Sequence, residues 1–293
     1  MTASEYDAPI SPLGGLSIAI LAVSTSAILV RWSAAPSLVK AFYRVLFTVC
    51  LLAPVAFVRH RDAFEKISRR DLVAASGAGV ALAAHFASWF ESLNHTTVAA
   101  SVTLVQAQPL FVVVGAWAFL DERVSRRTTL GIGVALAGMV VMSLSDLVTA
   151  SGAPRPLLGN ALAIVGAVTA AAYVLTGRSV RSRVALVPYV VVVYSVCAVV
   201  LLTVTVARGD PLSGYPAREW LLFLGMAIGP GIFGHTVINW ALAHLESSVV
   251  SVSLLGEPVG STILALFLLG EIPTLPTVVG GAVVLAGIYV TST

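Results

Sequence analysis

Two apolar segments of this chain carry the same residues at the same spacing. The shared residues are a proline, a glutamate and two glycines: Pro109, Glu122, Gly131 and Gly138 in the first segment, and Pro258, Glu271, Gly280 and Gly287 in the second. Each pair is 149 positions apart, with no gap. The repetition predicts two copies of one structural unit, which we place at residues 1–147 and 148–293. The join, near 145–156, is rich in Pro, Gly and Ser and is typical of a loop.

The chain is too poor in charge to cover its surface with charged side chains. Of its 293 residues, 58% are hydrophobic and 11% are charged, whereas soluble domains carry about 25% charged residues. Lipid must therefore solvate most of the surface. The apolar runs are too long, and alternate too little, for barrel strands. Helices satisfy every backbone polar group within lipid, so we predict an all-α integral membrane protein.

About 20 apolar residues cross a bilayer as a helix, and the chain has room for ten transmembrane helices. We expect them at 13–30, 38–58, 72–93, 97–120, 128–147, 157–176, 184–206, 219–243, 248–269 and 275–289. Five spans per copy is an odd number, so the second copy must enter the membrane upside down. The predicted architecture is two inverted five-helix repeats.

The distribution of Lys and Arg predicts the orientation. If the N-terminus is cytoplasmic, 11 basic residues fall in cytoplasmic loops and five in outer loops. Cytoplasmic loops carry the excess of Lys and Arg in membrane proteins. We therefore expect a multi-pass protein of the plasma (inner) membrane with both termini in the cytoplasm. Basic residues distributed in this way predict no nucleic-acid partner.

Several short motifs resemble one family of membrane proteins. They are Leu120-Asp-Glu122, Leu269-Gly-Glu271, Phe42-Tyr-Arg44, Asn239-Trp-Ala-Leu242 and Gly256-Glu-Pro258. With ten spans in two halves, the chain is similar to the EamA family of the drug/metabolite transporter superfamily over nearly its whole length. The resemblance implies the fold and a transport function. It does not imply a substrate, because the family spans amino acids, other metabolites and drugs.

Motifs for enzymatic chemistry are absent from the sequence. The two lysines, Lys40 and Lys66, lack the context of a phosphate-binding P-loop, and the five histidines have no recognisable metal-ligand spacing. We therefore predict no enzyme activity, no catalytic residue, no metal site and no cofactor.

Glu257 is the most informative polar residue within a predicted span. An ionisable group in the bilayer costs roughly 2.5–3.5 kcal/mol on insertion scales, so it usually has a function. Glu257 precedes Pro258, and the equivalent positions in the first repeat are Gln108 and Pro109. Glu257 is expected to bind a substrate amine or to carry a proton. The alternative is a structural acid paired with a neighbouring helix.

Two histidines form a second repeated feature. His85 and His235 are 150 positions apart, and each is followed by a tryptophan, Trp89 or Trp240. They are expected to line a central cavity, or else to be neutral histidines hydrogen-bonded to an adjacent helix. The residues that we expect to converge between the halves are His85, Trp89, Gln106, His235, Asn239, Trp240 and Glu257.

Arg44 and Tyr173 are further candidates for the site. Arg44 is expected to bind a substrate carboxylate; the alternatives are an ion pair with Glu91 and a side chain that reaches up to the interface. Tyr173 is a candidate for the cavity wall, although aromatic residues in spans also serve packing. Glu122 and Glu271 lie just before a helix, where a carboxylate favours the helix N-terminus, and we expect both to be structural.

The leading hypothesis is a secondary transporter that exports a small metabolite or amino-acid-like solute by alternating access. Proton coupling through Glu257 is its more specific version. An uncoupled facilitator of the same fold is an alternative, and a membrane scaffold or sensor subunit is an alternative from another class. The expected partners are a small solute and the lipid bilayer, with protons and a homodimer left open.

Overall fold

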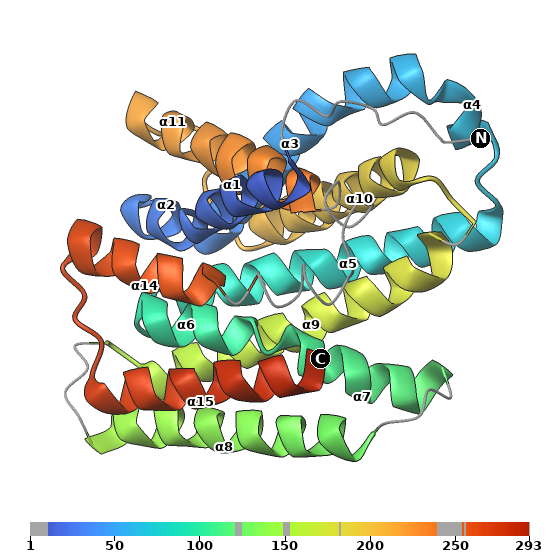
Figure 1. The fold of residues 1–293 in the computed structure, drawn as a ribbon. Coiled ribbons are helices and arrows are strands. Elements are labelled where there is room, and N and C mark those ends of the chain that lie inside the picture. The colour runs from blue at the N-terminus through green and yellow to red at the C-terminus, as the bar shows by residue number, and fades with distance from the viewer. Residues whose placement is uncertain are drawn as a thin grey trace.

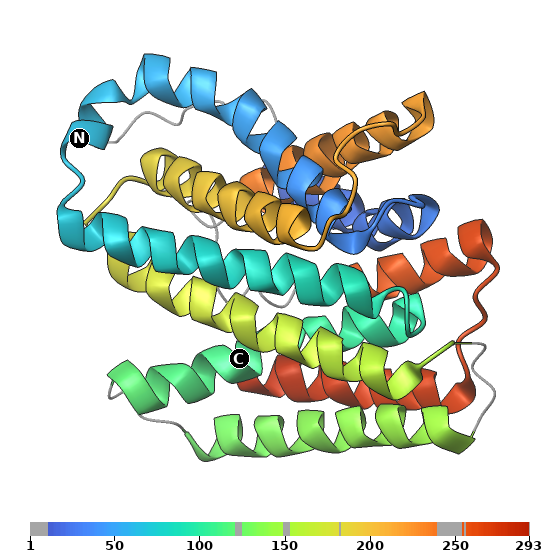
Figure 2. The same ribbon diagram turned by 180° about the vertical axis from the view of Figure 1, so that it is seen from behind.

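The computed structural model describes residues 11–120, 125–148, 153–181, 183–238, 254 and 256–292. All regular structure in these ranges is helical (Figures 1 and 2). The elements are α1 (Pro12–Ser24), α2 (Ser26–Trp32), α3 (Ser37–Arg59), α4 (Arg61–Glu65), α5 (Arg69–Ser92), α6 (Val98–Val105), α7 (Gln108–Leu120), α8 (Arg126–Val148), α9 (Pro156–Arg181), α10 (Leu186–Ala207), α11 (Ala217–Met226), the π-helix η1 (Ala227–Thr236), α14 (Gly256–Leu269) and α15 (Leu275–Ser292).

Six helical stretches within the described ranges are long and apolar enough to cross a membrane. They are Pro12–Trp32, Ser37–Arg59, Arg69–Ser92, Val98–Gly115, Pro156–Arg181 and Leu186–Ala207. Shorter apolar helices occupy Gly256–Leu269 and Leu275–Val290. The predicted all-α membrane fold is confirmed. The short helix α4 was not predicted, and the expected spans 219–243 and 248–269 lie partly outside the described residues.

Two of the predicted spans, 13–30 and 97–120, are interrupted. The first breaks at Thr25, whose backbone N–H bonds to Ala22 O, three residues back, at 3.2 Å. The other breaks after α6, where Ala107 N–H also bonds three residues back, to Leu104 O. Pro109 follows and has no N–H to continue the α-helical ladder.

A third span changes its helical form. Residues Ala227–Thr236 form the π-helix η1, which follows α11 and contains Pro230. Proline removes one ladder hydrogen bond, and π-helical turns are often found at functional sites. Both repeats therefore contain backbone that departs from the regular α-helix: two breaks in the first repeat and the π-helix in the second.

The two repeats meet through α8 and α15, which lie side by side and antiparallel in Figures 1 and 2. A Cβ on Gly138 would lie 2.7 Å from Gly280 O, and one on Gly287 would lie 2.7 Å from Gly131 O. Gly131 and Gly280 are repeat equivalents, as are Gly138 and Gly287. The first glycine of each copy therefore contacts the second glycine of the other, as antiparallel packing of equivalent helices requires. The predicted inverted repeat is present in these contacts.

This close packing gives a testable prediction about stability. The Gly138→Ala variant is expected to lose about 1–3 kcal/mol of stability, because the new methyl group meets backbone atoms that have little room to move. Gly133 is a matched control in the same helix, since a Cβ there meets nothing within 4 Å. Gly133→Ala should be neutral or gain up to about 1 kcal/mol from helix propensity. Thermal unfolding in detergent measures both variants, and equal midpoints would contradict the packing argument.

The helices run between two ends of the molecule, which we name by their acidic residues. At the Asp71 end, Arg183 Nη2 lies 2.7 Å from Asp71 Oδ1 and joins the start of α5 to the segment before α10. At the Glu271 end, Arg31 Nη2 lies 2.5 Å from Glu271 Oε1. Each ion pair joins one repeat to the other.

Candidate functional site

A cavity of about 70 Å³ lies beside the helix interruptions. Its lining residues are Val23, Ser26, Arg44, His85, Trp89, Val105, Gln106, Gln108, Pro230, His235 and Glu257. They come from α1, α2, α3, α5, α6, α7, η1 and α14 and from the residue that follows α6. The volume accommodates a few water molecules or one small chemical group. A whole metabolite needs a larger space.

The structure brings together six of the nine site residues that the sequence predicts. They are Arg44, His85, Trp89, Gln106, His235 and Glu257. Asn239 and Trp240 lie outside the described residues. Tyr173 is not among the lining residues and packs against the main hydrophobic core.

Two polar residues of the cavity were missing from the predicted site. Gln108 is the repeat equivalent of Glu257, 149 positions earlier, so the alignment of the two repeats already contained the signal. Ser26 lies directly after the break at Thr25 and hydrogen-bonds Arg44 Nη1 at 3.1 Å. No sequence pattern singles out Ser26, because its place in the site depends on that break.

Glu257 is the acidic residue that lines the cavity, and it is 9% exposed. Gln106 Nε2 donates a hydrogen bond to Glu257 Oε2. Gln106 lies at the break between α6 and α7, so an interrupted helix of the first repeat holds the carboxylate of the second. This hydrogen bond leaves the other carboxylate oxygen for further partners.

Arg44 is 2% exposed and is among the largest fully buried side chains. Besides Ser26, its guanidinium contacts two aromatic faces, with its central carbon 4.5 Å from the ring centre of Phe86 and 5.6 Å from that of Phe90. Within the described residues, no carboxylate oxygen lies within 4.0 Å of its nitrogens. Cation–π contacts offset part of the cost of burial, but among the residues that the structure describes the guanidinium has no directly bonded counter-ion.

The expected alternatives for Arg44 are not found. Glu91 instead accepts hydrogen bonds from His95 at 3.1 Å and Asn94 at 3.3 Å, near the end of α5. The prediction of an ion pair between Arg44 and Glu91 is therefore wrong. An arginine that is 2% exposed is also too deeply enclosed to reach the membrane interface.

The orientation of His85 follows from its partner on a neighbouring helix. His85 Nδ1 lies 2.9 Å from Gly166 O, in α9. A carbonyl oxygen only accepts, so Nδ1 carries the hydrogen, and in the neutral ring Nε2 is an acceptor. The ring also stacks on Trp89, with centres 5.9 Å apart. His85 thus combines a hydrogen bond to an adjacent helix with a place in the cavity wall.

His235 reaches the same cavity from η1 in the second repeat. The pair of histidines predicted from the repeat spacing therefore lines one space. Gln108 and Glu257, the other repeat-related pair, do the same. The cavity consequently lies between the repeats, with equivalent positions contributing from both sides.

Glu271 has a different structural role from the one predicted. It was expected to stabilise the helix that follows it, which is α15. Instead, Glu271 Oε2 accepts a hydrogen bond from Val98 N–H at 2.8 Å, at the N-terminus of α6. The carboxylate therefore stabilises a helix of the other repeat. Glu122 lies outside the described residues.

An all-α membrane protein with inverted repeats and a polar cavity at interrupted helices has the architecture of a secondary transporter. The chain belongs to the EamA-like transporter family, whose sequence model matches residues 12–144 and 157–293. It is a membrane transporter and not an enzyme.

The chain is similar to proteins described as transporters, and the similarity covers most of the length of both chains. A protein of Archaeoglobus fulgidus, described as an uncharacterized transporter, is 28% identical over 85% of this chain and 92% of its own length. A second one from that organism is 25% identical over 86% of each chain. A protein of known crystal structure shares the fold, with a TM-score of 0.66 and 20% identity over 96% of both chains.

Proposed function

We propose that this protein exports a small amino-acid-like metabolite by alternating access, with the cavity at Arg44 and Glu257 as the solute site. One observation carries the proposal: a buried cation and a buried carboxylate line the same small space between the repeats. Arg44 would bind the carboxylate of the solute, and Glu257 would bind its ammonium group. A solute with both groups satisfies both protein charges, which low-dielectric surroundings otherwise penalise.

Proton coupling through Glu257 is part of the proposal. The Glu257 side chain is neutral when it holds a proton and forms a neutral pair when it holds a cationic solute group, so it exchanges one for the other. Gln106 hydrogen-bonds the carboxylate and fixes its position during the exchange. His85 and His235 add polar ring atoms to the same wall. The cavity has to enlarge to admit a solute, which rocking of one repeat against the other provides.

The experiment is a metabolite screen in proteoliposomes across imposed pH gradients. We expect flux of at least one zwitterionic solute and dependence of that flux on the gradient. Flux that ignores the gradient would support an uncoupled facilitator of the same fold. Absence of flux for all amino-acid-like solutes would contradict the proposed substrate class.

We also propose that both termini face the cytoplasm and that the repeats divide as 1–147 and 148–293. The excess of basic residues in one set of loops supports this orientation. Single cysteines at the exposed positions Arg69 and Arg126 should react with a membrane-impermeant thiol reagent from the cytoplasmic side. A cysteine at Arg155, at the other end, should react only from outside. Labelling of the first two from opposite sides would contradict the topology.

A further inference from the structure

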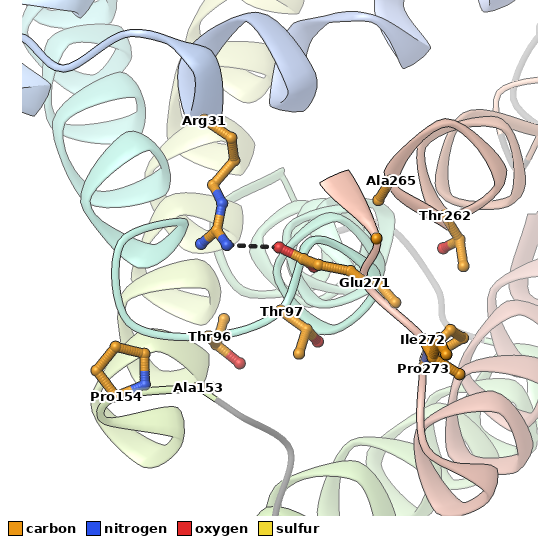
Figure 3. Close-up of a pocket in the computed structure, with 12 residues that line it drawn as sticks. Arg31, Thr96, Thr97, Ala153, Pro154, Thr262, Ala265, Glu271, Ile272 and Pro273 are labelled. Carbon is orange, nitrogen blue, oxygen red and sulfur yellow. Dashed lines mark hydrogen bonds and ion pairs between the residues drawn. The ribbon is translucent and has the colours of Figure 1, made fainter. Parts of the chain in front are cut away.

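We propose that Arg31 and Glu271 form a latch that closes the Glu271 end and opens once in each transport cycle. The inference rests on the alternating access proposed above. Arg31 lies at the end of α2 in the first repeat, and Glu271 follows α14 in the second. Their side chains meet across the space between the repeats, as Figure 3 shows, with Arg31 Nη2 2.5 Å from Glu271 Oε1.

Backbone groups hold both partners of the latch in place. Glu271 Oε2 accepts the hydrogen bond from Val98 N–H, where the dipole of α6 favours a carboxylate. Arg31 Nη1 donates to the carbonyl oxygen of Leu93, which directly follows α5. One guanidinium and one carboxylate therefore connect α2, α6, the end of α5 and the segment after α14.

The exposure of the pair suits a contact that breaks and reforms. The side chains of Arg31 and Glu271 are 29% and 18% exposed. Water is therefore available to both groups when they separate. Breaking a deeply buried ion pair would leave uncompensated charges and would be strongly unfavourable. A partly exposed pair opens at a small cost.

The latch joins half-helices whose other ends lie beside the central cavity. The seven residues of α2 begin directly after the break at Thr25, and the eight residues of α6 end at the break before α7. Helix interruptions are the places where a half-helix changes direction relative to its partner. Release of the latch would remove the ion pair through which Glu271 ties these two half-helices together.

A second pocket at the latch has a volume of about 250 Å³ (Figure 3). One face of α14 connects it to the central cavity, because Glu257 lines the cavity, Ser261 lies one turn further on, and Ala265 lines the latch pocket. Ser261 is fully buried, and its hydroxyl donates to Ser24 O at 3.1 Å. This contact between α1 and α14 separates the two spaces, and opening the latch would join them.

The test measures the accessibility of Ser261 to a thiol reagent. The reporter is Ser261→Cys in a Cys50→Ser background, in proteoliposomes with a charged methanethiosulfonate on the Glu271 side. Glu271→Gln keeps an oxygen for Val98 N–H and removes the charge. We expect labelling of the reporter to be about fivefold faster, as loss of a partly exposed ion pair predicts. Arg31→Gln should have the same effect.

Two controls separate a latch from general loosening. Cys197 is a buried native thiol in α10 and remains in the background as an internal reference. Arg208→Gln removes the pair of Arg208 and Asp210, which are 3.8 Å apart at the same end but within one repeat. The labelling rate of Cys197 should stay the same in Glu271→Gln. The Arg208→Gln substitution should leave the labelling rate of the reporter at Ser261→Cys unchanged.

Unchanged labelling of the reporter in Glu271→Gln would overturn the latch, and so would equally faster labelling of Cys197. If Ser261→Cys does not fold, Ser24→Cys reports from the other side of the same contact. The assay contains no solute. If reporter labelling does not change but solute flux is observed, the latch is rejected and the proposed function stands. If labelling becomes faster as expected but no solute is transported, the proposed function is rejected and the latch stands.

Discussion

The Glu257→Gln variant is expected to lose uphill, gradient-driven transport while it retains downhill exchange of solute. Glutamine keeps the shape of the side chain and a hydrogen-bonding oxygen for Gln106, but it cannot bind and release a proton. A gradient of one pH unit drives up to about tenfold accumulation when one proton is exchanged per solute. We expect the wild-type protein to approach this accumulation and the variant to show none. Solute accumulation in proteoliposomes, with and without the gradient, measures the effect.

Glu91→Gln is the matched control for this experiment. Glu91 is also an acid in a membrane-spanning helix, but it bonds to His95 near the end of α5 and does not line the cavity. Its replacement should leave accumulation unchanged. If Glu257→Gln only lowers stability and the surviving protein still accumulates solute, Glu257 is structural. If wild-type flux ignores the gradient, facilitated diffusion is the better description.

The Arg44→Met variant is expected to lose solute transport and to keep or gain thermal stability. Methionine fills a similar elongated volume without a charge. No carboxylate among the described residues forms an ion pair with Arg44. Removing the arginine therefore leaves none of these acids without an ion-pair partner. Replacing a buried charge with an apolar side chain is often neutral or stabilising. Loss of a charge-assisted contact to the solute, worth about 1.5–3 kcal/mol, corresponds to a decrease in affinity of roughly 10-fold to more than 100-fold.

Flux of the solute identified in the screen and the unfolding midpoint are measured on the same preparations. Arg44→Lys serves as the comparison, because it keeps the charge but loses the planar, bidentate geometry that suits a carboxylate. It should transport more than Arg44→Met and less than the wild-type protein. A midpoint that falls sharply in Arg44→Met, together with normal flux per folded molecule, would show that Arg44 holds the helices together instead.

The fold was predictable because membrane proteins obey few and strict rules. Scarce charge and long apolar runs require helices in lipid, and the 149-residue repeat with five spans per copy requires inversion. The glycines that revealed the repeat are the same ones that allow α8 and α15 to approach closely. The repeated glycines therefore indicate the duplication, and they also lie at the contact that joins the two repeats.

The candidate site was predictable where it follows the repeat. His85 and His235 were matched by their spacing, and both line the cavity. Gln108 was equally visible as the equivalent of Glu257, but a neutral amide costs less in lipid than a carboxylate and is therefore a weaker signal of a site. Tyr173 shows the opposite error, because an aromatic residue within a span fits a cavity wall and a packed core equally well.

Helix interruptions were not predictable from hydropathy. The breaks at Thr25 and before α7 lie inside continuous apolar runs, which satisfy the composition of a straight span. A proline such as Pro109 shows where one hydrogen bond is lost, but the neighbouring helices decide how the chain responds. These breaks place Ser26 and Gln106 in the site.

The sequence by itself determined the class of solvent, the number of repeats and their inversion, because these depend on composition and spacing along the chain. Only the tertiary structure decided which polar groups meet. It separated Arg44 from Glu91, placed Glu271 on α6 and against Arg31, and joined Gln106 to Glu257 across the repeats. The physical reason is that a side chain's partners depend on the rotation and tilt of packed helices. Those are set by contacts between residues far apart in the chain, such as Arg31 and Glu271.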